Sequence, residues 1–90
     1  MATGSAKTGA EIREIFIGFV ITNYLFGDSS KLPSDEESLI ELGVVDSTGI
    51  LELIEFTEHE FGISISDSET IPENLGSIAN LVTFVQKKLG

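Results

Sequence analysis

The stretch Leu42–Ile54, LGVVDSTGILELI, contains the clearest signal for a helix start in this 90-residue chain. Asp46 and Ser47 have short side-chain oxygens that can accept hydrogen bonds from the unpaired amides at a helix N-terminus, so either could be the cap. Apolar residues then recur at helical spacing as far as Phe61, and Gly62 ends the pattern. The stretch therefore predicts a helix that runs from Asp46 or Ser47 to Phe61.

The two faces of this predicted helix differ in chemistry. One face is mostly apolar and consists of Ile50, Leu53, Ile54, Thr57 and Phe61. The opposite face is polar and consists of Thr48, Glu52, Glu55 and His59, with Glu58 and Glu60 beside the apolar face. This division indicates a helix that packs on a core with one side and meets water with the other.

Upstream of this stretch, the sequence predicts a first helix from about Ala10 to near Gly27. Its apolar residues recur at helical spacing and include Ile12, Ile15, Phe16, Phe19 and Val20. Residues 1–9 are small and mostly polar, so we expect them to form a frayed, flexible tail. The remaining residues 10–90 are enough for one small domain.

A long loop is expected to connect the first helix to the central one. Residues 27–37 are rich in glycine, serine, aspartate and proline, which favour turns. Residues 38–43 predict one helical turn in which Leu39 and Leu42 point inward. Gly43 would let the backbone reverse before the central helix begins.

Downstream of Gly62, residues 67–75 have room for a short third helix, which Pro72 limits to a turn or two. Ser77 is a suitable cap for a last helix. The apolar residues of that helix recur at helical spacing and are Ile78, Leu81, Val82, Val85 and Leu89. The sequence thus predicts an all-α fold: a small four-helix bundle with three longer helices, one short third helix and a long first loop.

The composition excludes several classes of protein. A formal net charge of −10 repels nucleic-acid phosphates and attracts basic surfaces, so we expect no nucleic-acid partner. The chain has no cysteine, which excludes disulfides and thiolate metal sites. No apolar run approaches the ~20 residues that span a bilayer, and the N-terminus lacks a secretory pattern. We expect a cytoplasmic protein, and we expect it to be monomeric.

Residues suited to conventional catalysis are scarce. His59 is the only histidine and lies among carboxylates on the polar face of the central helix, as a solvated surface residue would. No serine occurs in a Gly-x-Ser-x-Gly pattern, and the acidic residues do not follow the spacing of a calcium-binding loop. We therefore expect no catalytic residue and no metal site. A small enzyme, as one alternative, would depend on Glu52, Glu55 and His59.

Several of these features together resemble the acyl carrier protein family. The motif is Leu-Gly-x-x-Asp-Ser, followed by an amphipathic helix with outward carboxylates that ends in Glu-Phe-Gly-Ile. The resemblance covers the chain from about Ile12 to Leu89. The matching positions are Leu42, Gly43, Asp46, Ser47, Glu52, Leu53, Glu60, Phe61, Ile63, Ser77 and Ile78.

The resemblance implies that Ser47, preceded by Asp46, accepts a 4′-phosphopantetheine arm from coenzyme A. A separate phosphopantetheinyl transferase would add the arm, and the thiol of the arm would carry an acyl or aminoacyl group as a thioester. The protein would be a carrier that serves enzymes of fatty-acid, polyketide or related biosynthesis, and not an enzyme itself. At a helix N-terminus, unpaired amides and the positive end of the helix dipole tolerate the charge of a phosphodiester.

Partner enzymes with basic docking patches, such as acyl-loading ligases or synthases, are expected to bind the outward face of the central helix. The residues expected there are Thr48, Glu52, Glu55 and Glu58. Thr48 and Glu55 replace residues that are often apolar in fatty-acid carriers, and Gly49 costs roughly 1 kcal/mol relative to alanine in a helix. These departures suggest a dedicated stand-alone carrier of a secondary pathway. With Asp46 before Ser47, the chain resembles acyl carriers more than peptidyl carriers.

In carriers of this family, an acyl chain can fold back between the second and third helices. The cleft residues expected here are Ile50, Leu53, Ile54, Ile63, Ile71, Ile78 and Val82. The short helix at Pro72 should be the least firmly packed wall of this cleft. Without a covalent arm, the chain would instead be an acidic helical protein-interaction module, which is the main alternative function.

Overall fold

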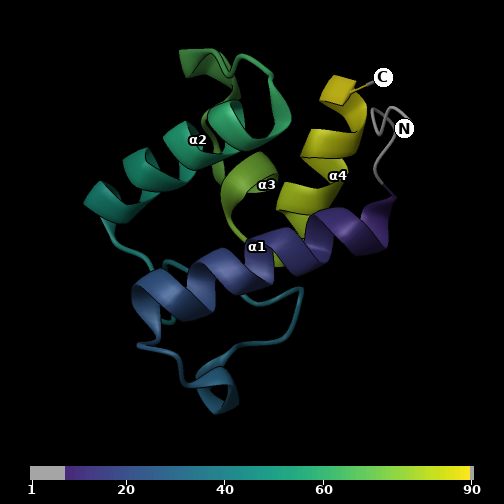
Figure 1. Cartoon of the computed structure of the whole chain (residues 1–90). Coiled ribbons are helices and arrows are strands. Elements are labelled where there is room, and N and C mark those ends of the chain that lie inside the picture. The colour runs from purple at the N-terminus through teal and green to yellow at the C-terminus, as the bar shows by residue number, and fades with distance from the viewer. Residues whose placement is uncertain (1–7, 90) are drawn as a thin grey trace.

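The structure is a computed structural model and describes residues 8–89. Its helices are α1 (Gly9–Tyr24), α2 (Ser47–Phe61), α3 (Pro72–Leu75) and α4 (Ile78–Leu89), with short 3-10 turns η1 (Ser29–Lys31) and η2 (Asp67–Glu69). No strand occurs in the described part of the chain. Figure 1 shows the helices gathered into a small bundle, with the long connection from α1 to α2 below α1. The predicted all-α, four-helix fold is confirmed.

Helix α1 begins at a capping box. The Thr8 side chain accepts a hydrogen bond from the amide of Glu11 (3.1 Å), and the Thr8 amide donates to Glu11 Oε1 (2.8 Å). The helix therefore begins one residue earlier than expected, and residues 1–7 of the expected tail lie outside the described residues. It ends at Tyr24, earlier than expected, because the backbone enters a left-handed conformation at Phe26 (φ 55°).

Apolar residues from every helix and from the first connection form the core. The fully or almost fully buried ones include Ile12, Phe16, Val20, Leu39, Val45, Leu53, Leu75, Ile78, Leu81 and Val85. Burial of side chains of this size is worth about 1.5–3 kcal/mol each before the entropy of folding is subtracted. These residues include the central positions of the apolar faces that the sequence predicts for the three longer helices.

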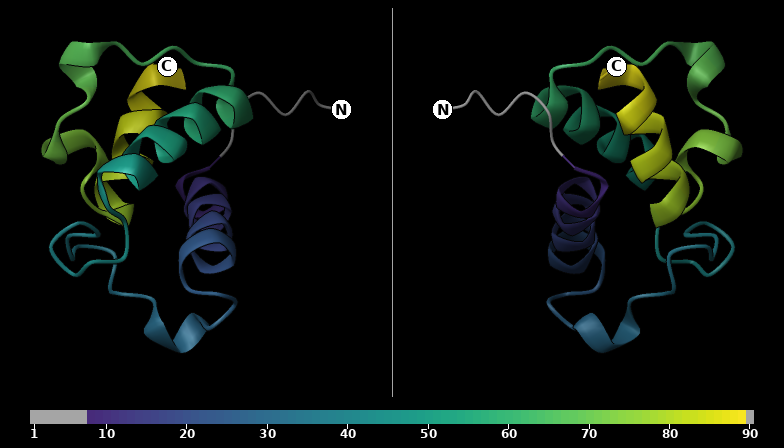
Figure 2. Two further views of the ribbon diagram at one scale, coloured as in Figure 1. Left: turned by 90° about the vertical axis from the view of Figure 1, so that its left-hand side faces the viewer. Right: turned by 90° about the vertical axis from the view of Figure 1, so that its right-hand side faces the viewer.

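The helices pack on one another in two different ways. Helix α4 lies between α1 and α3 and contacts both closely (Figure 2). Between α1 and α2, by contrast, phenylalanine rings fill the space: Phe19 and Phe56 stack with their centroids 4.1 Å apart, and Phe16 contacts Phe61 at 5.5 Å. Because these rings are bulky, α1 and α2 approach each other mainly through side chains.

The turn before α2 differs from the prediction at Leu42. Leu39 is fully buried, and its carbonyl accepts hydrogen bonds from the amides of Val44 (2.9 Å) and Val45 (3.1 Å). Leu42, which was expected to point inward, is 53% exposed. The turn is not helical, because the backbone reverses at Gly43 with a φ of 76°. This reversal leaves Leu42 on the outside.

Polar contacts attach the long first connection to the bundle. Arg13 donates from Nε to Asp35 Oδ2 (2.7 Å) and from Nη2 to Asp35 Oδ1 (3.1 Å). The Asp35 carbonyl accepts from the amide of Ala79 (2.9 Å), and the Leu39 amide donates to the carbonyl of Gly76 (2.8 Å). The hydrogen bonds from Arg13 lower the pKa of the Asp35 carboxyl below its ordinary value. The connection is thus held to α1 and α4 before it reaches α2.

Candidate functional site

The start of α2 presents Ser47 to solvent. Asp46 is the cap: its Oδ1 accepts from the amide of Gly49 (2.8 Å), and its carbonyl accepts from the amide of Ile50 (2.9 Å). Ser47 is the first helical residue, and both Ser47 and Thr48 are exposed. The Ser47 hydroxyl takes part in none of the hydrogen bonds formed among residues 8–89. It is therefore open to reaction with a group that arrives from solvent.

Gly49 has a packing role that the sequence did not reveal. A Cβ atom at this position would lie 2.8 Å from Val45 Cγ1 and 3.2 Å from Tyr24 Cε1, and Gly49 itself is buried. The sequence indicated only the helix-propensity cost of Gly49, and the structure adds a packing role for this position. The missing side chain lets Val45 and the Tyr24 ring approach the helix, and this contact offsets the low helix propensity of glycine.

Tyr24 joins the end of α1 to the first turns of α2. Its hydroxyl donates to Glu52 Oε1 (2.8 Å) and is 3.2 Å from the carbonyl oxygen of Gly49. Burial, together with the hydrogen bond to Glu52, raises the pKa of Tyr24 to about 12. The phenol therefore remains a donor throughout the physiological range, and it fixes the position of the Glu52 carboxylate.

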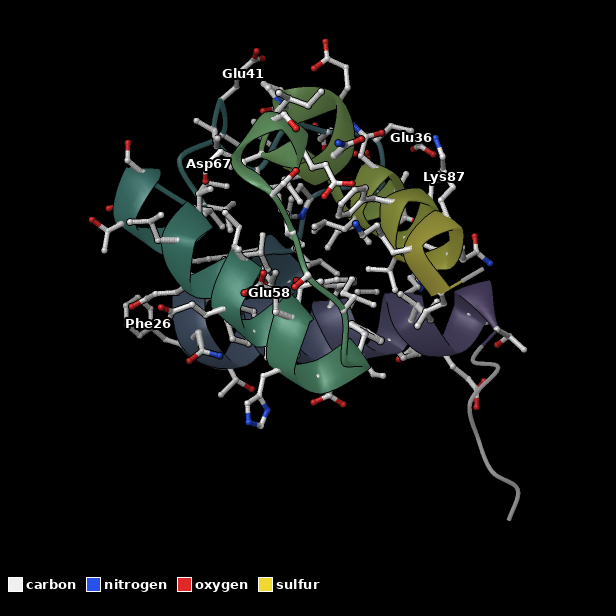
Figure 3. The ribbon with its side chains drawn as sticks, turned by 90° about the horizontal axis from the view of Figure 1, so that it is seen from above. Phe26, Glu36, Glu41, Glu58, Asp67 and Lys87 are labelled. Atoms are coloured by element: carbon white, nitrogen blue, oxygen red, sulfur yellow. The ribbon has the colours of Figure 1, made fainter. Side chains whose placement is uncertain are left out.

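The expected docking carboxylates do not all lie together. An open groove of about 410 Å³ runs between α1 and α2 and is lined by Phe19, Asn23, Glu52, Glu55, Phe56, His59 and Glu60. Glu58 is absent from this lining. It is half-buried, and its Oε2 accepts from the amide of Ile65 in the linker after α2 (2.8 Å), which Figure 3 shows beside it. The structure thus brings Glu52 and Glu55 together and separates Glu58 from them.

No cation lines this groove. The lining residues include no lysine or arginine. Elsewhere in the described chain, Arg13 is paired with Asp35 and Lys88 with Glu69 (3.0 Å). The groove therefore presents negative charge without a counter-charge from its own walls, which favours binding of a basic surface.

A small apolar pocket of about 80 Å³ lies between the start of α2 and α3. Its lining residues are Ile40, Ile50, Thr70, Ile71, Pro72, Leu75 and Gly76. Of the expected cleft residues, Ile50 and Ile71 line this pocket. Leu53 and Ile78 are fully buried in the core, and the half-buried Ile54, Ile63 and Val82 pack against it. The pocket is therefore shallower and nearer to α3 than the expected cleft.

Sequence reasoning missed two kinds of residue at this site. The first is Ile40, which lines the pocket, and an apolar residue in a polar loop was the available signal for it. Leu51 is 63% exposed on α2, four residues after Ser47 and hence one turn along the same face. Its departure from the polar pattern of that face was the signal that could have identified it.

Two kinds of site are missing from the described residues. Between residues 8 and 89, no helix combines the length and the apolar character needed to cross a membrane. The same residues contain no group of three or more histidine, aspartate or glutamate side chains that could hold a metal ion.

Comparison with known proteins adds a further observation. No protein-family model matches the sequence. A probable acyl carrier protein, PigG, of Serratia sp. is 34% identical over 71 residues, which cover 79% of this chain and 80% of the relative. An acyl carrier protein of Thermotoga maritima is 29% identical over 83 residues, or 90% of this chain and 99% of the relative. An acyl carrier protein of Solidesulfovibrio magneticus is 31% identical over 71 residues, which cover 79% of this chain and 87% of the relative.

Proposed function

Because the chain belongs to the acyl carrier protein family, we propose that it is a carrier whose Ser47 receives a 4′-phosphopantetheine arm from coenzyme A. The observation that supports this most directly is the exposed Ser47 hydroxyl, free of hydrogen bonds among residues 8–89, at the first position of α2. The terminal thiol of the arm would supply the chemistry by holding an acyl group as a thioester. The chain itself would hold and present that group and would catalyse no step.

The start of α2 suits a covalently attached phosphate. Amides of a first helical turn lack partners within the helix, and the dipole is positive there. Asp46 occupies the amide of Gly49, so the amides of Ser47 and Thr48 are those nearest to a phosphodiester on Ser47. In the transfer, Ser47 Oγ bonds to the phosphorus next to pantetheine and the pyrophosphate bond of coenzyme A breaks. Adenosine 3′,5′-bisphosphate leaves, and the serine proton passes to a base of the transferase.

Arm attachment tests the proposal directly. The chain is incubated with coenzyme A and a broad-specificity phosphopantetheinyl transferase, and its mass is measured. We expect wild type and Ser64→Ala, an exposed serine in the linker after α2, to gain the mass of one arm, and Ser47→Ala to gain none. A wild type that stays unmodified with several transferases would favour the acidic interaction module instead.

We propose that partner enzymes dock on the outward face of α2 around Ser47, with Thr48, Leu51, Glu52 and Glu55 as the contact residues. Steering by the acidic groove would raise the rate of encounter with a basic rim. Glu58, although expected in this set, is engaged by the Ile65 amide and contributes less.

Charge reversal tests the docking surface. Glu55→Lys should slow arm transfer at low salt, and Glu52→Lys with Glu55→Lys should slow it further, with helix content unchanged. Glu36→Lys is the matched control, because it makes the same charge change at another exposed position. Figure 3 shows Glu36 on the opposite side of the molecule from Phe26, which lies just after the end of α1. A wild-type rate that does not fall as salt rises, or equal slowing by Glu36→Lys, would contradict steering by this surface.

The cargo is proposed to be an acyl chain that enters the pocket at α3. A volume of about 80 Å³ is well below the roughly 300–1,000 Å³ of ordinary ligand pockets, so the wall made by Ile71 and Leu75 must move outward to admit a medium-length chain. An octanoyl-loaded form should therefore melt at a higher temperature than the arm-bearing form. Its amide signals should shift at Ile71 and Ile50 more than in α1. No stabilisation, with shifts confined to neighbours of Ser47, would mean that the cargo stays in solvent.

The pathway is proposed from the surface next to Ser47. Thr48 and Glu55, both exposed on α2, make that surface less apolar than the resemblance to fatty-acid carriers would imply. We therefore propose a dedicated cytoplasmic carrier for fatty-acid-like or polyketide intermediates of a secondary pathway. Loading assays with purified acyl and aminoacyl ligases would test this, and preferential aminoacyl loading would contradict it.

A further inference from the structure

Phe26, two residues after the end of α1, is the most exposed large apolar residue of the described chain. Its side chain is 94% exposed, and its φ of 55° lies in the left-handed region, which is unfavourable for a bulky residue. Among residues 8–89, no other residue except glycine has a positive φ. Glycine or asparagine would fit this backbone with less strain. Folding alone therefore does not account for a phenylalanine here.

Hydrogen bonds fix the turn that carries Phe26. The amide of Gly27 donates to the carbonyl of Ile21 (2.9 Å), and the amide of Asp28 donates to the carbonyl of Leu25 (2.9 Å). The Leu25 side chain is buried in the core. Because the backbone on both sides of Phe26 is held, the side chain leaves the turn in a fixed direction. Less conformational entropy is then lost when a partner covers it.

Phe26 lies at the same end of the molecule as Ser47. Tyr24 attaches the end of α1 to the first turn of α2 through its hydroxyl and the carbonyl of Gly49 (3.2 Å). The left view of Figure 2 faces this end of the bundle, and Figure 3 shows Phe26 at the edge opposite to Lys87. A specific partner covers about 800 Å² of each protein. An enzyme that reaches Ser47 therefore has enough contact area to cover Phe26 as well.

The groove that begins near Phe26 is acidic. The groove between α1 and α2 extends to Asn23, three residues before Phe26, and carries the carboxylates of Glu52 and Glu55 with no lysine or arginine among its lining residues. An exposed aromatic side chain beside a groove lined by carboxylates is complementary to an apolar recess bordered by basic side chains. We propose that Phe26 inserts into such a recess on the transferase that modifies Ser47, an inference that rests on the arm attachment proposed above.

The test compares arm transfer from coenzyme A by a broad-specificity phosphopantetheinyl transferase in three variants. Phe26→Asn suits the left-handed backbone but lacks the ring, Phe26→Trp keeps an aromatic ring, and Leu89→Ala removes an exposed apolar side chain at the C-terminal end of α4. For Phe26→Asn we expect KM for the carrier to rise about tenfold with kcat within about twofold of wild type, as for loss of an aromatic interface residue. Phe26→Trp and Leu89→Ala should keep the wild-type KM.

Thermal melting separates docking from folding. The midpoint of Phe26→Asn should equal or exceed that of wild type, because asparagine relieves the backbone strain. An unchanged KM for Phe26→Asn, an equal rise for Leu89→Ala, or a rise accompanied by a lowered midpoint would each overturn the inference. If the wild type receives no arm, the proposed function and this inference fail together. A modified wild type with unchanged Phe26→Asn kinetics rejects this inference alone.

Discussion

The start of α2 and the wall formed by α3 lie on opposite sides of the small apolar pocket, yet they are held in different ways. At the start of α2, the Asp46 carboxylate caps the helix, and Gly49 is packed against Val45 and Tyr24. Helix α3 has only the residues Pro72–Leu75 and no side-chain cap. The first region is fixed by a side-chain cap and a closely packed glycine, whereas the second lacks a side-chain cap and is held by its packing on α4.

Helix α3 packs closely on α4, and two asparagine side chains add hydrogen bonds to its ends. Asn80 Nδ2 donates to the carbonyl of Pro72 (3.1 Å), and Asn74 Nδ2 donates to the carbonyl of Glu69 (2.9 Å). Leu75 is buried, but Ile71 is 41% exposed. A helix of one turn has little stability of its own. The start of α2 is therefore rigid, whereas the wall beside it, a single turn without a side-chain cap, is adaptable and can open locally.

The largest expected effect is at Gly49. Gly49→Ala should lower the free energy of unfolding by about 1–2 kcal/mol, because overpacking against the buried Val45 outweighs the gain in helix propensity. Gly18→Ala is the matched control: apart from the neighbouring backbone of α1, no atom lies within 4 Å of its Cβ position, so stability should rise by roughly 0.5–1 kcal/mol. Urea denaturation measures both. Equal effects would show that the start of α2 is not closely packed.

Loss of the cap should have the next largest effect. Asp46→Ala should destabilise the fold by about 1 kcal/mol, because the amide of Gly49 loses its acceptor, whereas Asp46→Asn should change stability by a few tenths of that. Denaturation with urea and the rate of arm transfer are measured for both variants. If Asp46→Asn were as destabilising as Asp46→Ala, the carboxylate charge and not the capping hydrogen bond would be the important feature.

Truncation of the α3 wall should have a smaller effect on global stability. Ile71→Ala should cost under about 1 kcal/mol, since a side chain that is 41% exposed loses little buried area. The local effect should be clearer: amide exchange at Asn74 and Leu75 should accelerate while exchange in α2 stays unchanged. Ile40→Ala, on the turn before α2, should leave the α3 amides unaffected. Uniform acceleration across the chain would contradict a separately opening wall.

The smallest expected effect is a pH dependence near α3. The hydrogen bond from the Ser66 amide, followed by that from Lys88, lowers the pKa of Glu69 below its ordinary value of 4.5. Its stabilising contribution is therefore present above pH 4.5 and is lost as the pH falls through the lower, folded-state value. The thermal midpoint of wild type should fall as the pH becomes acidic, and Glu69→Gln should make this fall smaller. Glu73→Gln, at an exposed position of α3, should leave the fall in the midpoint at acidic pH as in wild type.

Local sequence signals were sufficient for the ends of the two capped helices. Helix α2 ends at Phe61 as predicted, and Ser77 accepts from the amide of Asn80 (3.1 Å) at the start of α4. Caps and helical periodicity act within a few residues, so they can be recognised without knowledge of the fold. For the same reason, the choice of Asp46 over Ser47 as the cap needed the structure, because both residue types are suitable.

Features that depend on distant segments could not be predicted. Gly49 appeared costly because the approach of the Tyr24 ring, contributed by α1, is not visible in the local pattern. Glu58 appeared to point outward because the helical pattern does not reveal the Ile65 amide. The cleft was placed too deep because apolar spacing cannot separate Leu53, which fills the core, from residues that line a surface pocket.

The position of Tyr24 makes the protein its own spectroscopic reporter. The chain has one tyrosine and no tryptophan, so its near-ultraviolet fluorescence comes mainly from a ring in contact with the first turn of α2. The phenol is hydrogen-bonded to a carboxylate, and its emission depends on that bond. Any event that draws Glu52 away should therefore change the signal without an added label. The proposed docking of an enzyme on Glu52 can thus be followed by light emitted beside that carboxylate.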